Sequence, residues 1–142
     1  MISMEEQQLD LARKLEDERI EQYAKFNVPR IAVVGIGGAG CNIVSWIKER
    51  GMIGGKLLAL NTDANHLSIS KADRRILIGE KTTGGLGCGG YVKKGEQAIL
   101  ENAKDILKEL EPSRIIFLAA GLGGGTGTGG ICKLSESLQG SD

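Results

Sequence analysis

The stretch Ala119-Ala-Gly-Leu-Gly-Gly-Gly-Thr-Gly-Thr-Gly-Gly130 decides how the rest of the chain is interpreted, because eleven of its twelve residues are glycine, alanine or threonine. It directly follows the apolar run Ile115–Leu118. An apolar, β-branched run that breaks into glycines is typical of a buried strand ending in a loop. A flexible linker is the alternative, but such linkers are serine-rich and lie between domains, whereas this loop continues a predicted core strand.

Consecutive glycines allow backbone N–H groups to converge on one point, and such a nest binds an anion such as a phosphate. Thr126 and Thr128 add hydroxyls that can bond phosphate oxygens or water around a metal. We therefore predict a phosphate-binding loop. Within it, we expect Gly125 to need room for a phosphate and a φ closed to other residues.

Length indicates a single domain, and composition indicates no net charge. The chain has 142 residues, and 18 Lys and Arg balance 18 Asp and Glu, so charge does not indicate a nucleic-acid partner. The three cysteines form no Cys-x-x-Cys pair, which favours a reducing compartment without a zinc site. Since no apolar stretch approaches membrane-spanning length, we expect a soluble cytoplasmic protein without direct membrane insertion.

Residues 1–29 are predicted to form a leader, and 30–142 the globular part. From Met4 to Lys25 apolar residues recur at roughly helical spacing among charges, which predicts an amphipathic helix with a thin apolar stripe. Such a helix either packs on the domain or a neighbour, or remains solvated. We expect Pro29 to end it.

The first βα unit carries a glycine motif. Arg30–Gly35 is predicted to be a strand buried on both faces, and it runs into Gly35-Ile-Gly-Gly-Ala-Gly40, a match to G-x-G-x-x-G. A helix is predicted over Cys41–Arg50, with Trp46 in the core. Strand, glycine turn and helix form the context that a nucleotide-phosphate turn requires.

A second strand is predicted over Lys56–Leu60, followed by Asn61-Thr-Asp63. Asp63 stands about where a dinucleotide-binding protein carries its ribose-binding acid. His66 is the single histidine of the chain, and because no cluster of cysteines or acids accompanies it, we interpret it as structural.

The remaining segments repeat the alternation of strand and helix. A third strand, Arg75–Gly79, opens into a third glycine-rich loop, Lys81–Gly90; a helix follows over Lys93–Leu110 and a fourth strand over Arg114–Ala120. This order predicts an α/β fold: an open parallel Rossmann-like sheet with helices on both faces.

Three glycine loops then lie at the carboxyl ends of strands, the edge at which such sheets bind ligands. A dinucleotide needs only one of them for its pyrophosphate, whereas a triphosphate can use all three. The motif G-x-x-x-x-G-K-[ST] is absent, since the only Gly-Lys pair, Gly55-Lys56, is followed by Leu57. We therefore expect backbone amides and helix dipoles, with a metal ion, to hold the phosphates.

Four motifs in this order closely resemble the tubulin/FtsZ family, most of all its archaeal FtsZ members: Gly35–Asn42, Asn61–Asp63, Gly85–Gly90 and Gly123–Gly129. The last motif is the family's signature, and the similarity covers about Ile31 to Gly129. The resemblance implies a GTPase that binds GTP or GDP with Mg²⁺. It also implies head-to-tail polymerisation into filaments and cell-division partners at the division site.

The resemblance also implies roles for individual residues. Gly37–Asn42 would wrap the nucleotide, with Asn42 toward the base and ribose, and Asn61 and Asp63 would lie near the phosphate and metal. The expected GTP-binding residues are Gly37, Gly38, Ala39, Gly40, Cys41, Asn42, Asn61, Asp63, Cys88, Gly89, Gly90, Gly123, Gly124, Gly125, Thr126 and Gly127. No catalytic residue or direct metal ligand is expected within this chain, because the family hydrolyses GTP with carboxylates of a neighbouring subunit.

The chain departs from the family's pattern at several positions. Cys41 and Cys88 stand where the family more often has Asn and Ala, and Val92 where a proline usually follows. The family also continues well beyond this length, through guanine-recognising residues, a central helix and a second domain. We therefore expect an N-terminal part of the GTP-binding domain, with weak base selectivity, an unpaired edge at Arg114–Ala120 and no turnover alone.

Two alternatives remain open from the sequence. A Rossmann-type enzyme that binds NAD or ATP would use Gly35–Gly40 and Asp63, although it leaves the other two glycine loops without a role. In the second alternative, the chain is a nonfunctional remnant or a capping inhibitor of the complete protein.

Overall fold

The computed structural model describes residues 1–27 and 30–140. Pro29, expected to end the leader helix, lies outside the described residues. Helices and strands alternate along the chain. They are α1 (Met4–Asn27), β1 (Ile31–Ile36), α2 (Gly37–Arg50), β2 (Gly55–Asn61), α3 (Ala64–Ile69), β3 (Arg74–Leu77), α4 (Glu80–Thr83), α5 (Val92–Leu110), β4 (Ile115–Ala120) and α6 (Gly125–Gln139).

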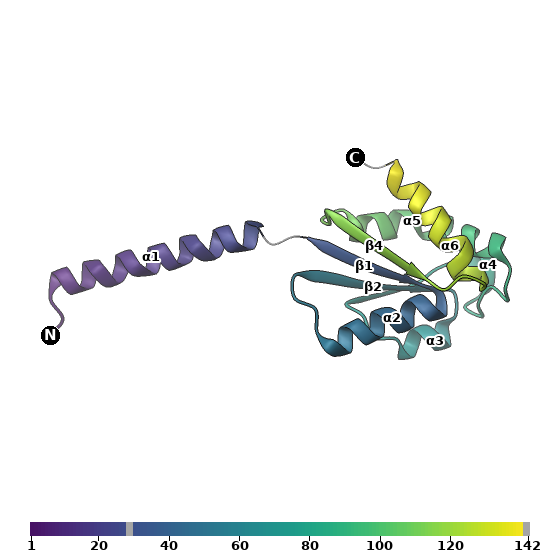
Figure 1. Ribbon diagram of the computed structural model, residues 1–142, viewed down its shortest axis with the longest axis horizontal. Coiled ribbons are helices and arrows are strands. Elements are labelled where there is room, and N and C mark those ends of the chain that lie inside the picture. The colour runs from purple at the N-terminus through teal and green to yellow at the C-terminus, as the bar shows by residue number, and fades with distance from the viewer. Residues whose placement is uncertain (28–29, 141–142) are drawn as a thin grey trace.

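The four strands form one parallel sheet in the order β3-β2-β1-β4. In its register, Val34 of β1 stands beside Leu58 of β2 and Leu118 of β4. Helices α5 and α6 cover one face of the sheet, and α2 and α3 cover the other (Figure 1). The predicted α/β class, with its open parallel sheet, is confirmed.

The core consists of two layers because side chains alternate across each strand. Ala32, Val34 and Ile36 of β1 belong to the layer under α5 and α6, where Ile99 and Leu134 are fully buried. The opposite layer holds the residues Val33, Cys41, Val44, Leu57, Ala59 and Leu67. Burial on both faces thus explains the apolar runs of β1 and β2. The expectation of a buried strand over Ile115–Leu118 is wrong, because no residue of β4 is buried.

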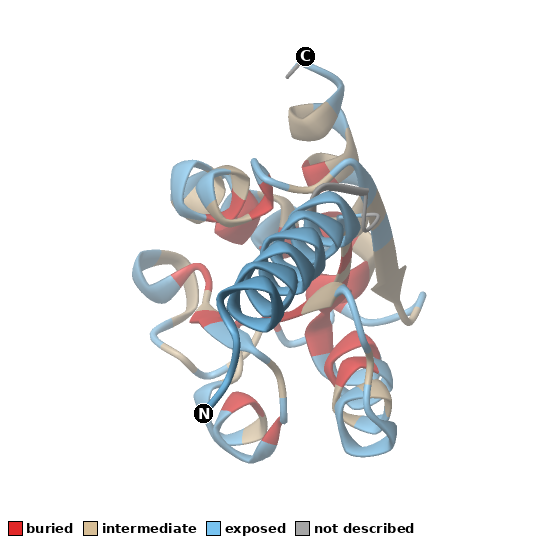
Figure 2. Cartoon of the chain, turned by 90° about the vertical axis from the view of Figure 1, so that its left-hand side faces the viewer, coloured by how far each residue is buried: buried red, intermediate tan, exposed pale blue. Residues whose placement is uncertain are grey.

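Helix α1 extends away from the sheet, and residues 1–25 are all exposed (Figures 1 and 2). Local contacts stabilise it. The hydroxyl of Ser3 accepts a hydrogen bond from the Glu6 N–H, and the Glu6 carboxylate accepts one from the Ser3 N–H, which is a capping box. Asp10 and Lys14 form an ion pair one turn apart. Of the part of the chain that the structure describes, no helix combines the length and apolar character needed to cross a bilayer.

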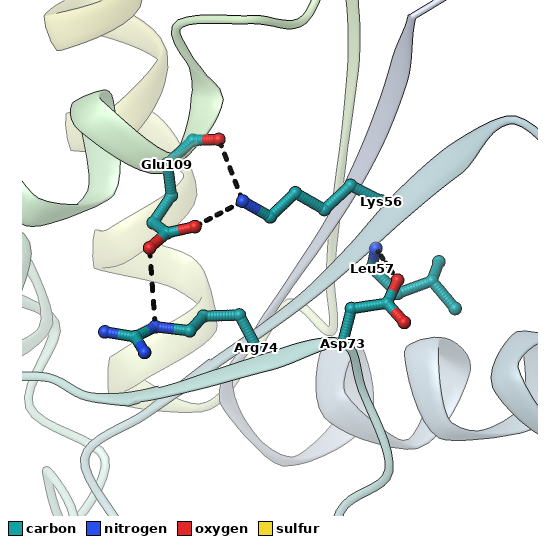
Figure 3. A network of polar contacts seen from close by, with 5 residues as sticks. All are labelled: Lys56, Leu57, Asp73, Arg74 and Glu109. Atoms are coloured by element: carbon teal, nitrogen blue, oxygen red, sulfur yellow. Dashed lines mark hydrogen bonds and ion pairs between the residues drawn. The ribbon is translucent and has the colours of Figure 1, made fainter.

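A polar network joins α5 to the amino ends of the strands, opposite the glycine loops (Figure 3). Lys56 donates to the Glu109 carboxylate and, at 3.4 Å, to its carbonyl oxygen, while Arg74 Nε lies 3.5 Å from Glu109 Oε1. The hydrogen bond from Lys56 lowers the pKa of the Glu109 carboxyl. Beside it, Asp73 accepts the Leu57 N–H at 2.8 Å. This network fixes the end of α5 against β2 and β3.

The prediction that Trp46 belongs to the core is wrong. Its side chain is 55% exposed, and the Arg50 guanidinium carbon lies 3.6 Å from the ring centroid. Helix α2 packs on the sheet through Cys41 and Val44, so the opposite side of the helix, which carries Trp46, faces solvent.

Strand β4 is an edge strand of the described sheet, as expected for Arg114–Ala120. It pairs with β1 on one side, and two of its large apolar side chains, Ile115 and Phe117, are 47% and 56% exposed. An exposed apolar edge with unpaired backbone groups favours association between copies.

We therefore expect the chain to associate as its concentration rises, and we expect Phe117→Lys to reduce that association. Burying two such side chains contributes about 3–6 kcal/mol, of which the single lysine substitution would remove about half. Size-exclusion chromatography with light scattering across concentration measures the effect. Ile53→Lys is the matched control, because Ile53 is fully exposed in the α2–β2 loop. Equal association of wild type and Phe117→Lys would contradict the role of the edge.

Candidate phosphate-binding site

A cavity of about 410 Å³ lies at the carboxyl edge of the sheet. It is bounded by the segments that follow all four strands, in agreement with the predicted meeting of the glycine loops. Its lining residues are Ile36, Gly37, Gly38, Ala39, Asn61, Thr62, Asp63, His66, Gly87, Cys88, Gly89, Gly90, Gly121, Leu122, Gly124, Gly125, Thr126 and Gly127.

The first side of the cavity is the N-terminus of α2, which begins at Gly37 rather than at Cys41 as predicted. Gly37 has a φ of +76°, so the chain turns directly from strand into helix at a residue without a Cβ. No side chain caps this helix. Its first N–H groups are therefore available to a ligand, and the helix dipole favours an anion there.

The second side is the N-terminus of α6, which begins inside the predicted signature loop, at Gly125, and also has no side-chain cap. The two helix starts are adjacent, since a Cβ on Gly37 would lie 3.1 Å from the Gly127 nitrogen. Two uncapped helix N-termini therefore face one cavity. This arrangement is a ready anion site, and it suits several phosphate oxygens at once.

The third side is the loop after α4, which backbone hydrogen bonds fix to the end of β2. The Ala64 N–H donates to the Gly85 carbonyl at 2.9 Å, and the Gly87 N–H donates to the Thr62 carbonyl at 3.2 Å. An isolated bridge pairs Asp63 with Leu86. Gly89 and Gly90 are thereby held at the cavity wall.

The two threonines of the signature have different environments. The hydroxyls of Thr126 and Thr62 are 2.7 Å apart in the cavity floor, and Cys88 Sγ lies 3.6 Å from the Thr62 hydroxyl. Thr128 instead accepts the Gly123 N–H at 2.9 Å, closing its own loop. Thr126 is thus the signature threonine that lines the cavity.

The structure places twelve of the sixteen expected binding residues in the lining, all except Gly40, Cys41, Asn42 and Gly123. Gly40 is buried against Ala119, and Asn42 is exposed outside the cavity. Cys41 faces the sheet, with Sγ 3.4 Å from the Leu60 carbonyl oxygen. Burial raises the pKa of the Cys41 thiol to about 11, so it remains neutral in the core.

Six lining residues were not among those expected from the sequence: Ile36, Thr62, His66, Gly87, Gly121 and Leu122. Thr62 lies inside the motif Asn61–Asp63, so the sequence could have identified it as a lining residue. His66 is brought to the cavity by the single turn of α3 that Asp63 begins, since the Asp63 carboxylate accepts the His66 N–H at 3.1 Å. The sequence-based interpretation of His66 as structural did not consider that Asp63 caps a helix here.

The cavity offers backbone donors and few charges. Of the described residues that line it, none is Lys or Arg, and Asp63 is the one carboxylate. No group of three or more His, Cys, Asp or Glu able to hold a metal occurs within residues 1–27 and 30–140. One carboxylate beside phosphates nonetheless suits Mg²⁺, which typically binds one or two carboxylates together with phosphate oxygens and water.

The expectation that Gly125 has a φ closed to other residues is wrong, because its φ is not positive. Its constraint is space: a Cβ there would lie 2.7 Å from the Tyr91 carbonyl oxygen and 2.8 Å from Cys88 Cβ. Gly124, one residue earlier, has nothing within 4 Å of an added Cβ.

We therefore expect Gly125→Ser to lower the free energy of unfolding by about 1–3 kcal/mol, since backbone atoms must shift to admit the side chain. Gly124→Ser is the matched control and should unfold at the wild-type midpoint or slightly above it, because serine is a favourable N-cap. Thermal unfolding followed by circular dichroism measures both. Equal midpoints for the two variants would show that the close packing at Gly125 is unimportant.

Comparison with known proteins agrees with this geometry. Residues 30–141 match the model of the tubulin/FtsZ family, GTPase domain. The cell division protein FtsZ 1 of Methanocaldococcus jannaschii is 46% identical over 121 residues, which are 85% of this chain and 33% of that protein. FtsZ 1 of Archaeoglobus fulgidus is 44% identical, over 88% of this chain and 34% of that protein. The chain spans about a third of the length of these curated relatives.

Solved structures give the same result. An empty FtsZ dimer of M. jannaschii superposes with a TM-score of 0.81 at 44% identity, covering 87% of this chain and 36% of that one. CetZ2 from Haloferax volcanii, a GTPγS-bound protofilament, superposes with a TM-score of 0.70 at 27% identity, covering 80% and 36%. These similarities give no support to a nicotinamide- or ATP-dependent enzyme. The chain belongs to the tubulin/FtsZ family, within the GTPase domain of that family.

Proposed function

We propose that this chain binds GTP and GDP in the cavity at the carboxyl edge of the sheet, as the nucleotide-binding part of a cell-division GTPase. The observation that carries the proposal is the meeting of two uncapped helix N-termini, α2 and α6, in one cavity. Membership of the tubulin/FtsZ family supports the choice of a guanine nucleotide.

In this proposal the backbone holds the phosphates. The N–H groups of Gly37–Ala39 and of Gly124–Gly127 donate to phosphate oxygens, and Gly89 and Gly90 close the cavity over the last phosphate. Of the other expected binding residues, Gly40 and Cys41 support the turn from behind, and Asn42 and Gly123 lie outside the lining.

Magnesium, when bound with the nucleotide, would neutralise phosphate charge in a cavity without basic Lys or Arg side chains. Asp63, at the cavity wall, is the side chain suited to its coordination shell, and Asn61 lies beside it. The Thr126 hydroxyl can donate to a phosphate oxygen while it accepts from Thr62, since a hydroxyl has one donor and two acceptor sites.

We further propose that hydrolysis and filament formation belong to an assembly of subunits in the cytoplasm at the division site. Two related structures are a dimer and a protofilament, and the relatives are named cell division proteins. Within the described lining, Asp63 caps α3, Cys88 contacts Thr62 and His66 Nδ1 lies 3.4 Å from the Asn61 amide nitrogen, so we assign none of them as the base for the attacking water. Carboxylates of a neighbouring subunit would polarise that water.

Nucleotide binding tests the first proposal. Isothermal titration calorimetry should show that GDP and GTP bind at least about tenfold more tightly than guanosine, because the cavity contacts phosphates. Gly38→Asp should abolish binding, since it adds a negative charge at an open position; an added Cβ meets nothing closer than His66 Nε2 at 3.8 Å.

Gly38→Asn is the matched control, of the same size without the charge, and it should bind more tightly than Gly38→Asp. ATP and NAD serve as competitors. Binding of NAD in preference to GDP, or equal binding by the two Gly38 variants, would contradict the phosphate assignment.

Turnover tests the second proposal. A phosphate-release assay on the chain alone should give no GTP hydrolysis at any protein concentration, because we propose that the catalytic carboxylates come from a neighbouring subunit. Release in direct proportion to the concentration of a monomeric chain would show that the chain contains its own catalytic group.

A further inference from the structure

His66 is the one side chain of the described cavity lining with a ring N–H donor, and the binding scheme above gives it no role. Lys and Arg do not occur in that lining, and the other two titratable side chains are Asp63 and Cys88. A cavity that binds phosphates mainly through backbone donors and the Thr126 hydroxyl would gain from a further side-chain donor at its wall.

Hydrogen bonds determine which ring nitrogen of His66 carries the proton. The Asn61 side-chain carbonyl, Oδ1, accepts the Asp63 N–H at 3.2 Å, so the amide nitrogen of Asn61 points the other way. That nitrogen lies 3.4 Å from His66 Nδ1. Because the Asn61 amide is a donor, Nδ1 is the acceptor, and in the neutral ring the proton resides on Nε2.

The Nε2 atom faces the start of α2. A Cβ built on Gly38 would have His66 Nε2, at 3.8 Å, as its one neighbour within 4 Å. Gly38 is in the first turn of α2, where uncapped N–H groups line the same cavity. The Nε2–H and these backbone donors are therefore directed toward a shared space that is wide enough for an acceptor.

We propose that His66 is a nucleotide-binding residue whose Nε2–H donates to a phosphate oxygen held at the start of α2, with Asn61 as its positioning residue. This inference rests on the proposed binding of guanine nucleotides. The competing explanation is structural: the hydrogen bond with Asn61 merely fixes α3 to the end of β2.

Two isosteric variants separate these explanations. In glutamine the side-chain amide nitrogen reaches about as far as Nε2, whereas in asparagine it reaches only about as far as Nδ1. We expect His66→Gln to bind GDP within about twofold of wild type, and His66→Asn and His66→Leu to bind it about tenfold more weakly. A structural role would instead be satisfied by His66→Asn. Asn65→Ala, at an exposed position of the same helix, is the control and should bind as wild type.

A ligand series sharpens the test. Calorimetric titrations with guanosine should not distinguish His66→Leu from wild type, because guanosine has no phosphate to accept the bond.

The outcomes are distinct. If wild type binds GDP and His66→Leu binds it equally, the role of His66 is refuted while the nucleotide site stands. If wild type binds no guanine nucleotide, the proposed function fails, and the inference fails with it. Thermal unfolding of each variant confirms that the comparison is made between folded proteins.

Discussion

The position of the cavity depends on the contact between Gly40 of α2 and the carbonyl oxygen of Ala119 of β4, where no side chain fits between helix and strand. A Cβ on Gly40 would lie 2.4 Å from that oxygen, and one on Gly35 would lie 2.2 Å from the Gly40 carbonyl oxygen. Because both residues are glycine, α2 begins where β1 ends and approaches β4 at backbone distance. The first N–H groups of α2 are therefore held at the carboxyl edge of the sheet, and the position of the cavity follows.

Close approach between backbones at glycine also fixes the other side of the cavity. A Cβ on Gly95 of α5 would lie 2.1 Å from the Gly125 carbonyl oxygen, and one on Gly129 of α6 would lie 2.1 Å from the Val92 carbonyl oxygen. Helix α5 buries Ile99 and Ile106 against the sheet, so its own position is set by the core. The start of α6 is consequently determined by packing and needs no ligand to order it. Glycine thus serves this site mainly by allowing close approach of backbones.

The strands were predictable because β1, β2 and β4 contain apolar runs that end in glycine or a polar turn, and β3 contains the apolar pair Ile76 and Leu77. Four strands separated by helical segments allow few topologies. The starts of α2 and α6 were not predictable from the sequence, because glycine is a poor helix former. Only the contacts of Gly40 and Gly125 overcome that preference. Trp46 was misplaced for a related reason: periodicity identifies the helix, but tertiary packing selects the face that is buried. His66 required the orientation of α3, which depends on hydrogen bonds of Asp63 that composition does not reveal.

The two helices that begin at the cavity belong to opposite layers of the molecule: α2 covers one face of the sheet, and α6 covers the other. An anion that accepts hydrogen bonds from both helices would link the two layers, in addition to being the proposed substrate. Any ligand that binds the folded chain alone adds to its stability, by about 2.7 kcal/mol at a hundred times its dissociation constant. For a domain of marginal stability this gain is a substantial fraction of the total. Loss of the ligand would then lower the free energy of unfolding of both layers together, although packing alone already positions the start of each helix.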